Sequence, residues 1–197
     1  MPPKTHAVVL AGGKGRRMGG QDKGLVEAHG KHLVNYVCDA ISGQVDHLMI
    51  SANRHRSVYE QTGFDVIGDN VGDFAGPLAG ILSALAHVEK NELLFCYPCD
   101  MPAVPEQIVV TLREKLLIQQ TDICCLQIQD RLQPLISIMH ERVQPGLNNY
   151  LKSGHHKVMD WIKQLDMSVL ILQEQHAPDI NINNQRDLKR FLGYLTP

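Results

Sequence analysis

The sequence predicts a single α/β domain in which a Rossmann-like, doubly wound and mostly parallel sheet carries an antiparallel hairpin in its second half. Three observations support this prediction. Short apolar runs alternate with amphipathic stretches, which is typical of βαβ units. A glycine-rich segment follows the first apolar run, at the edge where open α/β sheets bind ligands. The length of 197 residues allows one sizeable core and argues against two independent catalytic domains.

The first half of the chain is expected to alternate between strands and helices. His6–Leu10 is a short apolar run and predicts a buried strand, whereas His32–Ser42 carries apolar side chains at helical spacing. Pro77 is well placed in the first turn of a helix. The other expected elements are a strand at His47–Ser51, the end of a short helix at Val58–Gln61, a strand at Asp65–Ile67, a helix at Leu78–Val88 and a strand at Leu93–Tyr97.

The second half leaves this alternation. The β-like runs Ile123–Ile128 and Leu135–Met139 flank Asp130 and Arg131, and this arrangement predicts the hairpin. No repeat or linker interrupts the chain, so residues 1–197 are expected to form one domain. The other expected elements are helices at Glu106–Leu117, Val143–Leu151 and His156–Leu165, a strand at Val169–Leu172, an extended segment at Asp179–Asn183 and a helix at Arg186–Tyr194.

Composition narrows the class of protein and its compartment. A formal net charge of -2 gives no general basic field, so a sequence-independent nucleic-acid binder is excluded. The odd number of cysteines, 5, suits a reducing compartment better than a disulfide framework. The N-terminus lacks the apolar region of a signal peptide, and no apolar stretch reaches the ~20 residues that span a bilayer. We therefore expect a soluble cytoplasmic protein without a membrane partner.

The most informative segment is LAGGKGRRMGGQDK, which runs from Leu10 to Lys23. Gly12, Gly13 and Gly15 lack Cβ atoms, so the backbone can turn sharply and present successive N–H groups to an anion. Two common phosphate-binding motifs do not fit, because G-x-x-x-x-G-K-[ST] is absent and methionine replaces the last glycine of G-x-G-x-x-G. A merely flexible surface loop remains the alternative.

The charge of this loop differs from that of the rest of the chain. Residues 14–23 carry four basic side chains against Asp22, which gives +3, so the other residues sum to -5. The side chains of Arg16 or Arg17 and Lys23, together with a divalent cation, would neutralise the roughly four negative charges of a triphosphate. The sequence thus predicts a triphosphate site on an otherwise acidic protein.

The loop and later segments resemble a known family. The pattern L-A-G-G-x-G-x-R-M-G, followed by Asp22 and Lys23, resembles the signature of nucleotidyltransferases that build sugar nucleotides, isoprenoid intermediates and molybdenum cofactor dinucleotides. Within that superfamily the chain is most similar to molybdenum cofactor guanylyltransferase. The likeness extends from Ala7 to about Pro102 and includes GGQDKGLVEAHGK, SANRH, GPLAGI and FCYPCDMP.

Two carboxylates follow predicted strands and are expected at the ligand-binding rim. Asp69 comes after the Val66–Ile67 run, and Asp100 follows the strand at Leu93–Tyr97. Mg²⁺ prefers one or two protein carboxylates together with phosphate oxygens, so Asp100 is the expected metal ligand. Capping of a turn or helix is the alternative role for both side chains.

The resemblance implies an enzyme that transfers GMP from GTP to the terminal phosphate of molybdopterin, or of its molybdenum form, with release of pyrophosphate. It implies residues 1–102 as the nucleotide-binding half and 103–197 as the acceptor-binding half. We expect Arg17, Lys23 and Asp100 to be catalytic, with Mg²⁺ on Asp100. Proteins that deliver the cofactor or accept the product are possible partners. The expected GTP contacts are Leu10, Ala11, Gly12, Gly13, Gly15, Lys23, Asp69 and Asp100.

The sequence departs from the family pattern at several positions, among them Ser51, Asn184 and Gln185, and it has Gln133-Pro134-Leu135 for the family's H-P-T. Ser51 stands where the family commonly has asparagine, and a hydroxyl cannot reproduce the paired hydrogen bonds of an amide. The family's N-x-N-T-P corresponds to Asn181-Ile-Asn183-Asn184-Gln185. Asn181 and Asn183 lie two residues apart, so on an extended segment they share one face and form the expected pterin-side pair.

Three other functions would also use features of this sequence. Cys96 and Cys99 form a C-x-x-C pair, which is typical of redox proteins, but the pair ends a strand and Asp100 opposes thiolate formation. A cytidylyltransferase for the same cofactor is an alternative enzyme. A non-catalytic nucleotide-binding module on the same fold is an alternative class, because a fold does not establish turnover.

Overall fold

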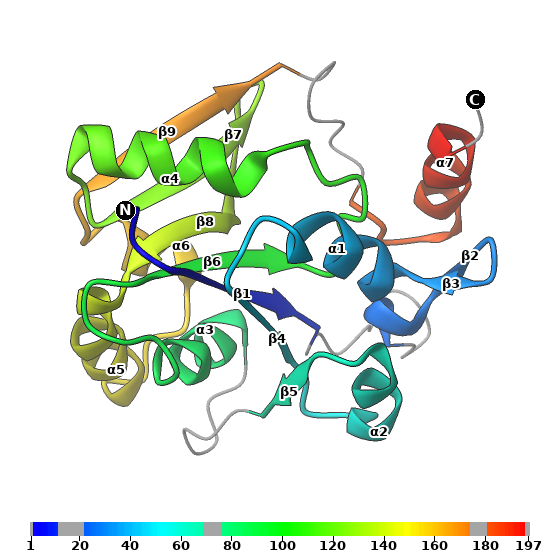
Figure 1. Cartoon of the computed structure of the whole chain (residues 1–197), viewed down its shortest axis with the longest axis horizontal. Coiled ribbons are helices and arrows are strands. Elements are labelled where there is room, and N and C mark those ends of the chain that lie inside the picture. The colour runs from blue at the N-terminus through cyan, green and yellow to red at the C-terminus, as the bar shows by residue number, and fades with distance from the viewer. Residues whose placement is uncertain (1, 12–21, 69–75, 174–180, 196–197) are drawn as a thin grey trace.

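A computed structural model of the chain describes residues 2–11, 22–68, 76–173 and 181–195. A seven-stranded sheet has the order β5-β4-β1-β6-β8-β7-β9, and β2 and β3 form a separate hairpin (Figure 1). The strands are β1 (Thr5–Leu10), β2 (Glu27–Ala28), β3 (Lys31–His32), β4 (His47–Ser51), β5 (Asp65–Ile67), β6 (Leu93–Pro98), β7 (Ile123–Ile128), β8 (Arg131–His140) and β9 (Met167–Leu172). The helices are α1 (Leu33–Ser42), α2 (Arg56–Tyr59), α3 (Pro77–Leu85), α4 (Ile108–Gln119), α5 (Gln144–Lys152), α6 (Val158–Ile162) and α7 (Gln185–Leu195), with short 3-10 turns at Lys23–Leu25, Glu60–Thr62 and Glu141–Val143.

The main sheet is parallel except at β8, which runs antiparallel to both β6 and β7. The predicted hairpin is therefore confirmed as β7–β8. Its ladder shifts register where Cys125 pairs with Ser137 but Leu126 pairs with Gln133. Pro134 lies in this irregular stretch, which suits a residue that has no N–H to donate to a ladder.

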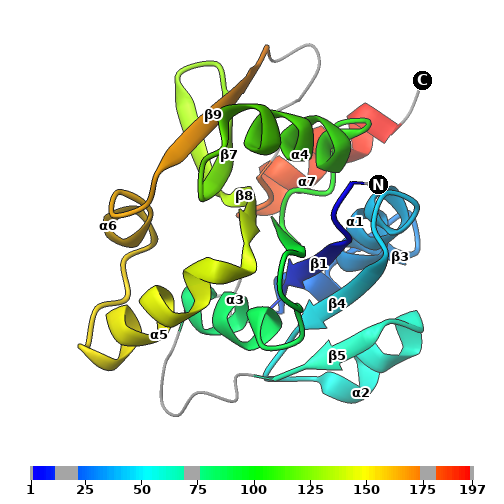
Figure 2. The same cartoon turned by 60° about the vertical axis from the view of Figure 1, so that its left-hand side comes forward.

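Helices cover both faces of the sheet, as expected for a doubly wound fold (Figures 1 and 2). Successive residues of β1 point to opposite faces, so Ala7 and Val9 pack in the cluster with α1 and α4, whereas Val8 packs in the cluster with α3, α5 and α6. Both faces of β1 are consequently apolar and buried, which explains the continuous apolar run in its sequence.

A third apolar cluster attaches the C-terminal helix to the first half of the chain. Phe191 of α7 is fully buried and packs with Leu33 of α1 and Ala28 of β2. Its ring meets that of Tyr36 edge to face, with centroids 5.3 Å apart. Figure 1 shows α7 beside the β2–β3 hairpin, on the side toward which β1 and β6 point. Residues remote in sequence thus meet at the carboxyl edge of these strands.

Several predicted boundaries are shifted. The helix predicted from Glu106 begins at Ile108, because Gln107 has a left-handed backbone with φ 52°. The helix predicted to reach Val88 ends at Leu85, and the one predicted over His156–Leu165 is only Val158–Ile162. Residues 181–184 belong to no helix or strand, and 179–180 of the predicted extended segment lie outside the described residues.

The β2–β3 hairpin was not predicted from the sequence. Its two strands are two residues each, too short to show an alternating pattern. The connecting residues His29 and Gly30 both have positive φ, as a type I′ turn requires. This short hairpin contributes Ala28 to the cluster that receives α7.

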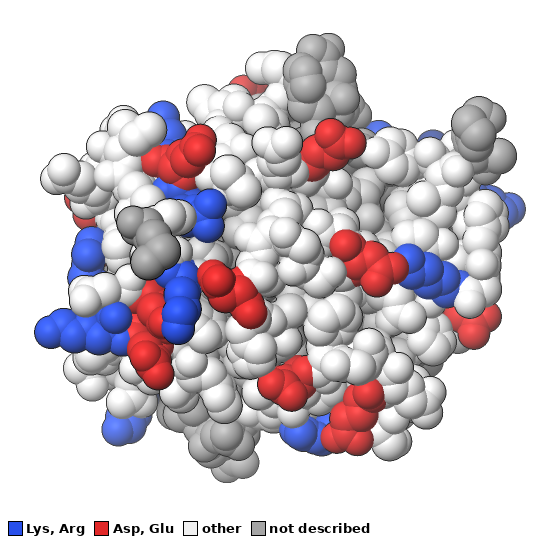
Figure 3. All heavy atoms as spheres, in the orientation of Figure 1, with Lys and Arg blue, Asp and Glu red and all other residues white. Residues whose placement is uncertain are grey.

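On the face shown in Figure 3, Lys and Arg are interspersed with Asp and Glu and form no continuous basic patch. Among the described residues, no helix is both long and apolar enough to cross a membrane.

Gly80 of α3 is expected to be intolerant of a side chain. A Cβ at this position would overlap Ser51 Oγ and lie 3.2 Å from Leu10 Cδ2, in a helix that is almost completely buried. We expect Gly80→Ala to lower the free energy of unfolding by about 1 to 3 kcal/mol, measured with urea. Gly146→Ala in α5 is the matched control, because its Cβ would meet open space and is expected to stabilise by about 0.5 to 1 kcal/mol. Equal changes in the free energy of unfolding for the two substitutions would contradict the steric explanation.

Candidate active site

The predicted nucleotide contacts in β1 lie at the centre of the carboxyl edge of the sheet. Leu10 is the last residue of β1 and pairs with Pro98, the last residue of β6. Beyond the ladder, the Cys99 N–H donates to the Leu10 carbonyl at 3.1 Å, and the Ala11 N–H donates to the Ser51 carbonyl at 2.9 Å. The three strands therefore stay in register to their ends, and Asp100 follows directly at this edge.

Lys23 lies between two oxygen acceptors from distant parts of the chain. Its Nζ donates to Asp100 Oδ2 at 2.8 Å and to Asn183 Oδ1 at 2.6 Å. The Lys23 and Asp100 side chains are only 19% and 18% exposed, so water screens their attraction less than it would at an open surface. The structure thus brings together three predicted site residues that are up to 160 positions apart in the sequence.

The predicted pair Asn181 and Asn183 lies on the same side, and the two side chains are hydrogen bonded. Asn183 Nδ2 donates to Asn181 Oδ1 at 2.9 Å. The intervening Ile182 is buried, and its N–H donates to the Asp100 carbonyl at 2.8 Å. This contact fixes the C-terminal segment against the end of β6, so that both asparagines reach the edge that carries Lys23.

The departures at Asn184 and Gln185 fall where α7 begins. Asn184 Oδ1 accepts from the N–H groups of Arg186 and Asp187, at 2.9 and 3.0 Å, so Asn184 is the N-cap. Asp187 Oδ2 accepts in return from the Asn183 and Asn184 N–H groups. Since asparagine caps helices as well as threonine does, this departure preserves the start of α7.

We expect Asn184→Ala to lower the free energy of unfolding by about 1 kcal/mol, because two N–H groups lose their acceptor. Asn184→Ser keeps a capping oxygen and is expected to remain near the original stability. Urea unfolding, together with hydrogen exchange of the α7 amides, measures both variants. Equal loss in the two variants would argue against the capping role.

Ser51, another departure, is buried beside α3. It is 4% exposed, and its Oγ occupies the space next to Gly80 where a Cβ would otherwise lie. The side chain therefore packs against the helix that begins at Pro77. The close approach of β4 and α3 at this point explains why a small residue faces Gly80.

Five predicted residues, Gly12, Gly13, Gly15, Arg17 and Asp69, lie outside the described residues. Their proposed contacts with the nucleotide stay predictions. The other predicted site residues are all described. Of these, Lys23, Asp100, Asn181 and Asn183 are joined by hydrogen bonds, while Leu10 and Ala11 lie at the adjacent strand end.

Comparison with known proteins places the chain in a family. The profile of the MobA-like NTP transferase domain matches residues 7–169. The chain belongs to the MobA-like NTP transferase family. The predicted membership of a nucleotidyltransferase family is confirmed.

Members of the MobA-like family are similar to this chain over nearly its whole length. The molybdenum cofactor guanylyltransferase of Photobacterium profundum is 35% identical over 188 residues, which cover 95% of each chain. The molybdenum cofactor guanylyltransferase of Shewanella putrefaciens is 35% identical over 191 residues, with 97% of each chain covered. The crystal structure of molybdopterin-guanine dinucleotide biosynthesis protein A from Archaeoglobus fulgidus has the same fold, with a TM-score of 0.80, 23% identity and coverage of 96% and 97%.

The described residues fit a divalent metal ion of the kind that such nucleotidyltransferases generally use. Asp100 offers hard oxygen ligands, and its contacts among the described residues engage Oδ2 and the main-chain carbonyl. No group of three or more His, Cys, Asp or Glu in the described parts of the chain could hold a metal alone. One carboxylate supplemented by phosphate oxygens and water is the arrangement that suits Mg²⁺.

The C-x-x-C pair does not have the geometry of a redox centre. Cys96 packs in the core on the α3 side of the sheet, whereas Cys99 packs on the α1 side. Burial raises the pKa of both thiols, and the neighbouring carboxylate of Asp100 raises the pKa of Cys99 further. Both residues therefore remain protonated core side chains of this MobA-like domain.

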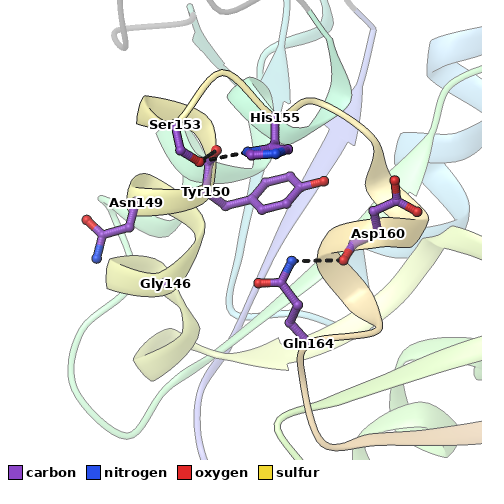
Figure 4. Close-up of a pocket in the computed structure, with 7 residues that line it drawn as sticks. All are labelled: Gly146, Asn149, Tyr150, Ser153, His155, Asp160 and Gln164. Atoms are coloured by element: carbon purple, nitrogen blue, oxygen red, sulfur yellow. Dashed lines mark hydrogen bonds between the residues drawn. The ribbon is translucent and has the colours of Figure 1, made fainter.

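Four basic residues at and after the end of α5 lie away from the Lys23 site, namely Lys152, His155, His156 and Lys157. This segment adjoins a groove of about 510 Å³ lined by Gly146, Asn149, Tyr150, Ser153, His155, Asp160 and Gln164 (Figure 4). His155 stacks on Tyr150 and its Nδ1 lies 2.8 Å from Ser153 Oγ. Figures 1 and 2 show α5 and α7 on opposite sides of the molecule. His155 thus makes contacts within its own segment, as expected of a solvated helix end.

Proposed function

We propose that this chain transfers GMP from GTP to the terminal phosphate of molybdopterin or its molybdenum form. The observation that carries the proposal is the Lys23 ammonium, held by Asp100 and Asn183 at the carboxyl edge of a MobA-like domain. The names of the relatives, which cover nearly the whole chain, support the same reaction.

In the proposed reaction an oxygen of the acceptor phosphate attacks the α-phosphorus of GTP. A new P–O bond forms, the bond between the α-phosphorus and the bridging oxygen breaks, and that oxygen leaves with its electron pair as part of pyrophosphate. Positioning and neutralisation of charge are the main tasks of the protein in such a transfer. Because both substrates are anions, cationic side chains also reduce their mutual repulsion.

Lys23 is the described cation best placed for this task. Two of its three ammonium N–H groups engage Asp100 and Asn183, so the third can donate to a phosphate oxygen. Leu10 and Ala11, at the end of β1, are proposed to contact the nucleotide. Arg17 is proposed to share the charge that develops in the transition state. Asn181 and Asn183 are proposed to bind the pterin side of the acceptor, since their amides can donate to and accept from its ring.

The metal ion is proposed to be Mg²⁺, held by Asp100. When bound, Mg²⁺ would neutralise triphosphate oxygens and polarise the phosphorus that is attacked. The proposal that Asp100 holds Mg²⁺ is supported by the hard oxygen ligands of its carboxylate, which follows the end of β6.

The division into a nucleotide-binding half, 1–102, and an acceptor-binding half, 103–197, remains a prediction. It is supported by Lys23 and Asp100 coming from one half and Asn183 from the other. The cytoplasmic location and any proteins that deliver the cofactor or receive the product also remain predictions.

Nucleotide choice is testable by thermal shift with GTP, CTP, ATP and UTP in the presence of Mg²⁺. We expect GTP to raise the unfolding temperature most, because ligand at 100 times its Kd adds about 2.7 kcal/mol to stability. Selective stabilisation by CTP would instead favour the cytidylyltransferase. Pyrophosphate release that requires both GTP and molybdopterin separates the enzyme from a non-catalytic module, which would bind GTP without turnover.

A further inference from the structure

The carboxylate next to Lys23 is buried and fully engaged, although nothing in the sequence pattern assigned it a role at the site. The side chain of Asp22 is 5% exposed. Its Oδ1 accepts from the Tyr59 hydroxyl at 2.6 Å and from the Gly24 N–H at 3.3 Å. Its Oδ2 lies 3.1 Å from His55 Nδ1. A buried carboxylate is costly unless it is hydrogen bonded, and three groups meet this need.

These contacts hold the short turn that carries Lys23. Asp22 is the N-cap of the 3-10 turn Lys23–Leu25, and its carbonyl also accepts from the Leu25 N–H at 3.1 Å. The backbone of Lys23 is thereby fixed on both sides. A lysine side chain has four rotatable bonds, so the place of its Cα decides how readily its ammonium stays on Asp100 and Asn183.

Tyr59 is the rigid end of this chain of contacts. It is fully buried in the cluster on the α1 side of the sheet. A Cβ on Gly24 would overlap its hydroxyl and lie 3.2 Å from two ring carbons, so only glycine permits this approach. Burial, the neighbouring Cys99 and the hydrogen bond to Asp22 all raise the pKa of Tyr59. The Tyr59 hydroxyl therefore stays protonated and can donate to Asp22.

His55 is the exposed end. Its side chain is 51% exposed, and its backbone is left-handed, with φ 51°, at the residue that precedes α2. Its ring lies against Asp22, with Nδ1 3.1 Å from Oδ2. The segment after β4 and the turn after the glycine-rich loop are therefore linked through one carboxylate.

We propose that Asp22 is a positioning residue that holds Lys23 on Asp100 and Asn183, with Tyr59 as its anchor. Asp22 acts through the backbone turn and makes no contact with substrate. The inference rests on the proposed function only where turnover is measured, because the placement of the Lys23 ammonium is measurable without substrate.

The first test measures the placement of Lys23 directly. Each variant is treated with a limiting amine-acylating reagent, and the modification rate of Lys23 is measured by mass spectrometry relative to Lys31. We expect Tyr59→Phe to raise the relative rate roughly tenfold, because a released ammonium leaves its acceptors. Tyr150→Phe is the control, since it removes a tyrosine hydroxyl that donates to the Lys157 carbonyl far from Lys23. An unchanged rate in Tyr59→Phe would overturn the proposal.

Substitutions of Asp22 separate positioning from general loss of folding. Asp22→Asn keeps an oxygen for Tyr59 and Gly24 and offers an amide to His55, whose neutral ring can accept. We expect it to retain most of the protection of Lys23, whereas Asp22→Ala loses it. If Asp22→Ala does not fold, the modification rates of Lys23 in Asp22→Asn and Tyr59→Phe still test the positioning role of Asp22. Loss of protection in Asp22→Asn equal to that in a folded Asp22→Ala would contradict the hydrogen-bonded geometry.

The second test uses turnover, measured as pyrophosphate release from GTP and molybdopterin. We expect Tyr59→Phe to lower kcat roughly tenfold with KM for GTP changed less than about twofold. In a Lys23→Met background the same substitution is expected to have no further effect on kcat, because the group it positions is absent. Additive losses would overturn the proposal. Failure of the wild-type protein to release pyrophosphate would refute the proposed function, while the modification rates would still decide the role of Asp22.

Discussion

Asp100→Asn is expected to lower kcat for pyrophosphate release by about 10²- to 10³-fold while the fold stays intact. The amide has the shape of the carboxylate but lacks its charge, so it binds a divalent cation weakly and pairs less well with Lys23. Turnover measured over a series of Mg²⁺ concentrations should show a large loss that added metal restores only in part. Urea unfolding verifies that the variant is folded.

Asp122→Asn is a matched control for this substitution. Asp122 also belongs to an ion pair, with Arg142 Nε at 2.9 Å, but this pair lies at a partly exposed site between β7 and the turn after β8. We expect activity and metal dependence close to those of the wild type. Activity near the wild-type level in Asp100→Asn would remove Asp100 from the proposed metal site.

Lys23→Met is expected to lower kcat by about 10²- to 10³-fold, which corresponds to about 3 to 4 kcal/mol of transition-state stabilisation. Methionine keeps an unbranched apolar chain and removes the charge that phosphate oxygens would meet. Lys23→Arg is not expected to restore activity, because a planar guanidinium cannot replace a compact ammonium between Asp100 and Asn183. Steady-state kinetics with varied GTP measures kcat and KM separately.

Lys31→Met controls for the loss of a lysine from an ion pair. Lys31 pairs with Asp39 and lies over the ring of Tyr36, and it is more exposed than Lys23. We expect it to keep nearly full activity. A Lys23→Met variant with raised KM but unchanged kcat would show that Lys23 binds GTP without stabilising the transition state.

Much of the fold was predictable because its signals are local. The strand at His6–Leu10 is observed as β1 (Thr5–Leu10), and the helix at His32–Ser42 as α1 (Leu33–Ser42). The strand was predicted from a short continuous apolar run, and the helix from apolar side chains at helical spacing. Helix ends were less predictable, since the left-handed backbone of Gln107 that delays α4 gives no signal in composition.

The candidate site was only partly predictable. Lys23 and Asp100 were predictable as site residues from the resemblance, and Asp100 also from its place after a strand, because the carboxyl ends of parallel strands share one edge. Asn183 was expected on the acceptor side, yet its amide contacts Lys23 directly. Asp22 was missed, although its place before Lys-Gly-Leu is typical of an N-cap.

The sequence by itself determined the α/β class, the hairpin, the family and the residue types that would meet a triphosphate. These properties follow from short-range sequence patterns, which involve only residues close to one another along the chain. Only the tertiary structure decided that α7 docks through Phe191 on the first half of the chain and that the Ile182 N–H donates to the Asp100 carbonyl, just after β6. Such contacts depend on the complementary shapes of surfaces formed by remote segments, and no spacing in the sequence encodes them.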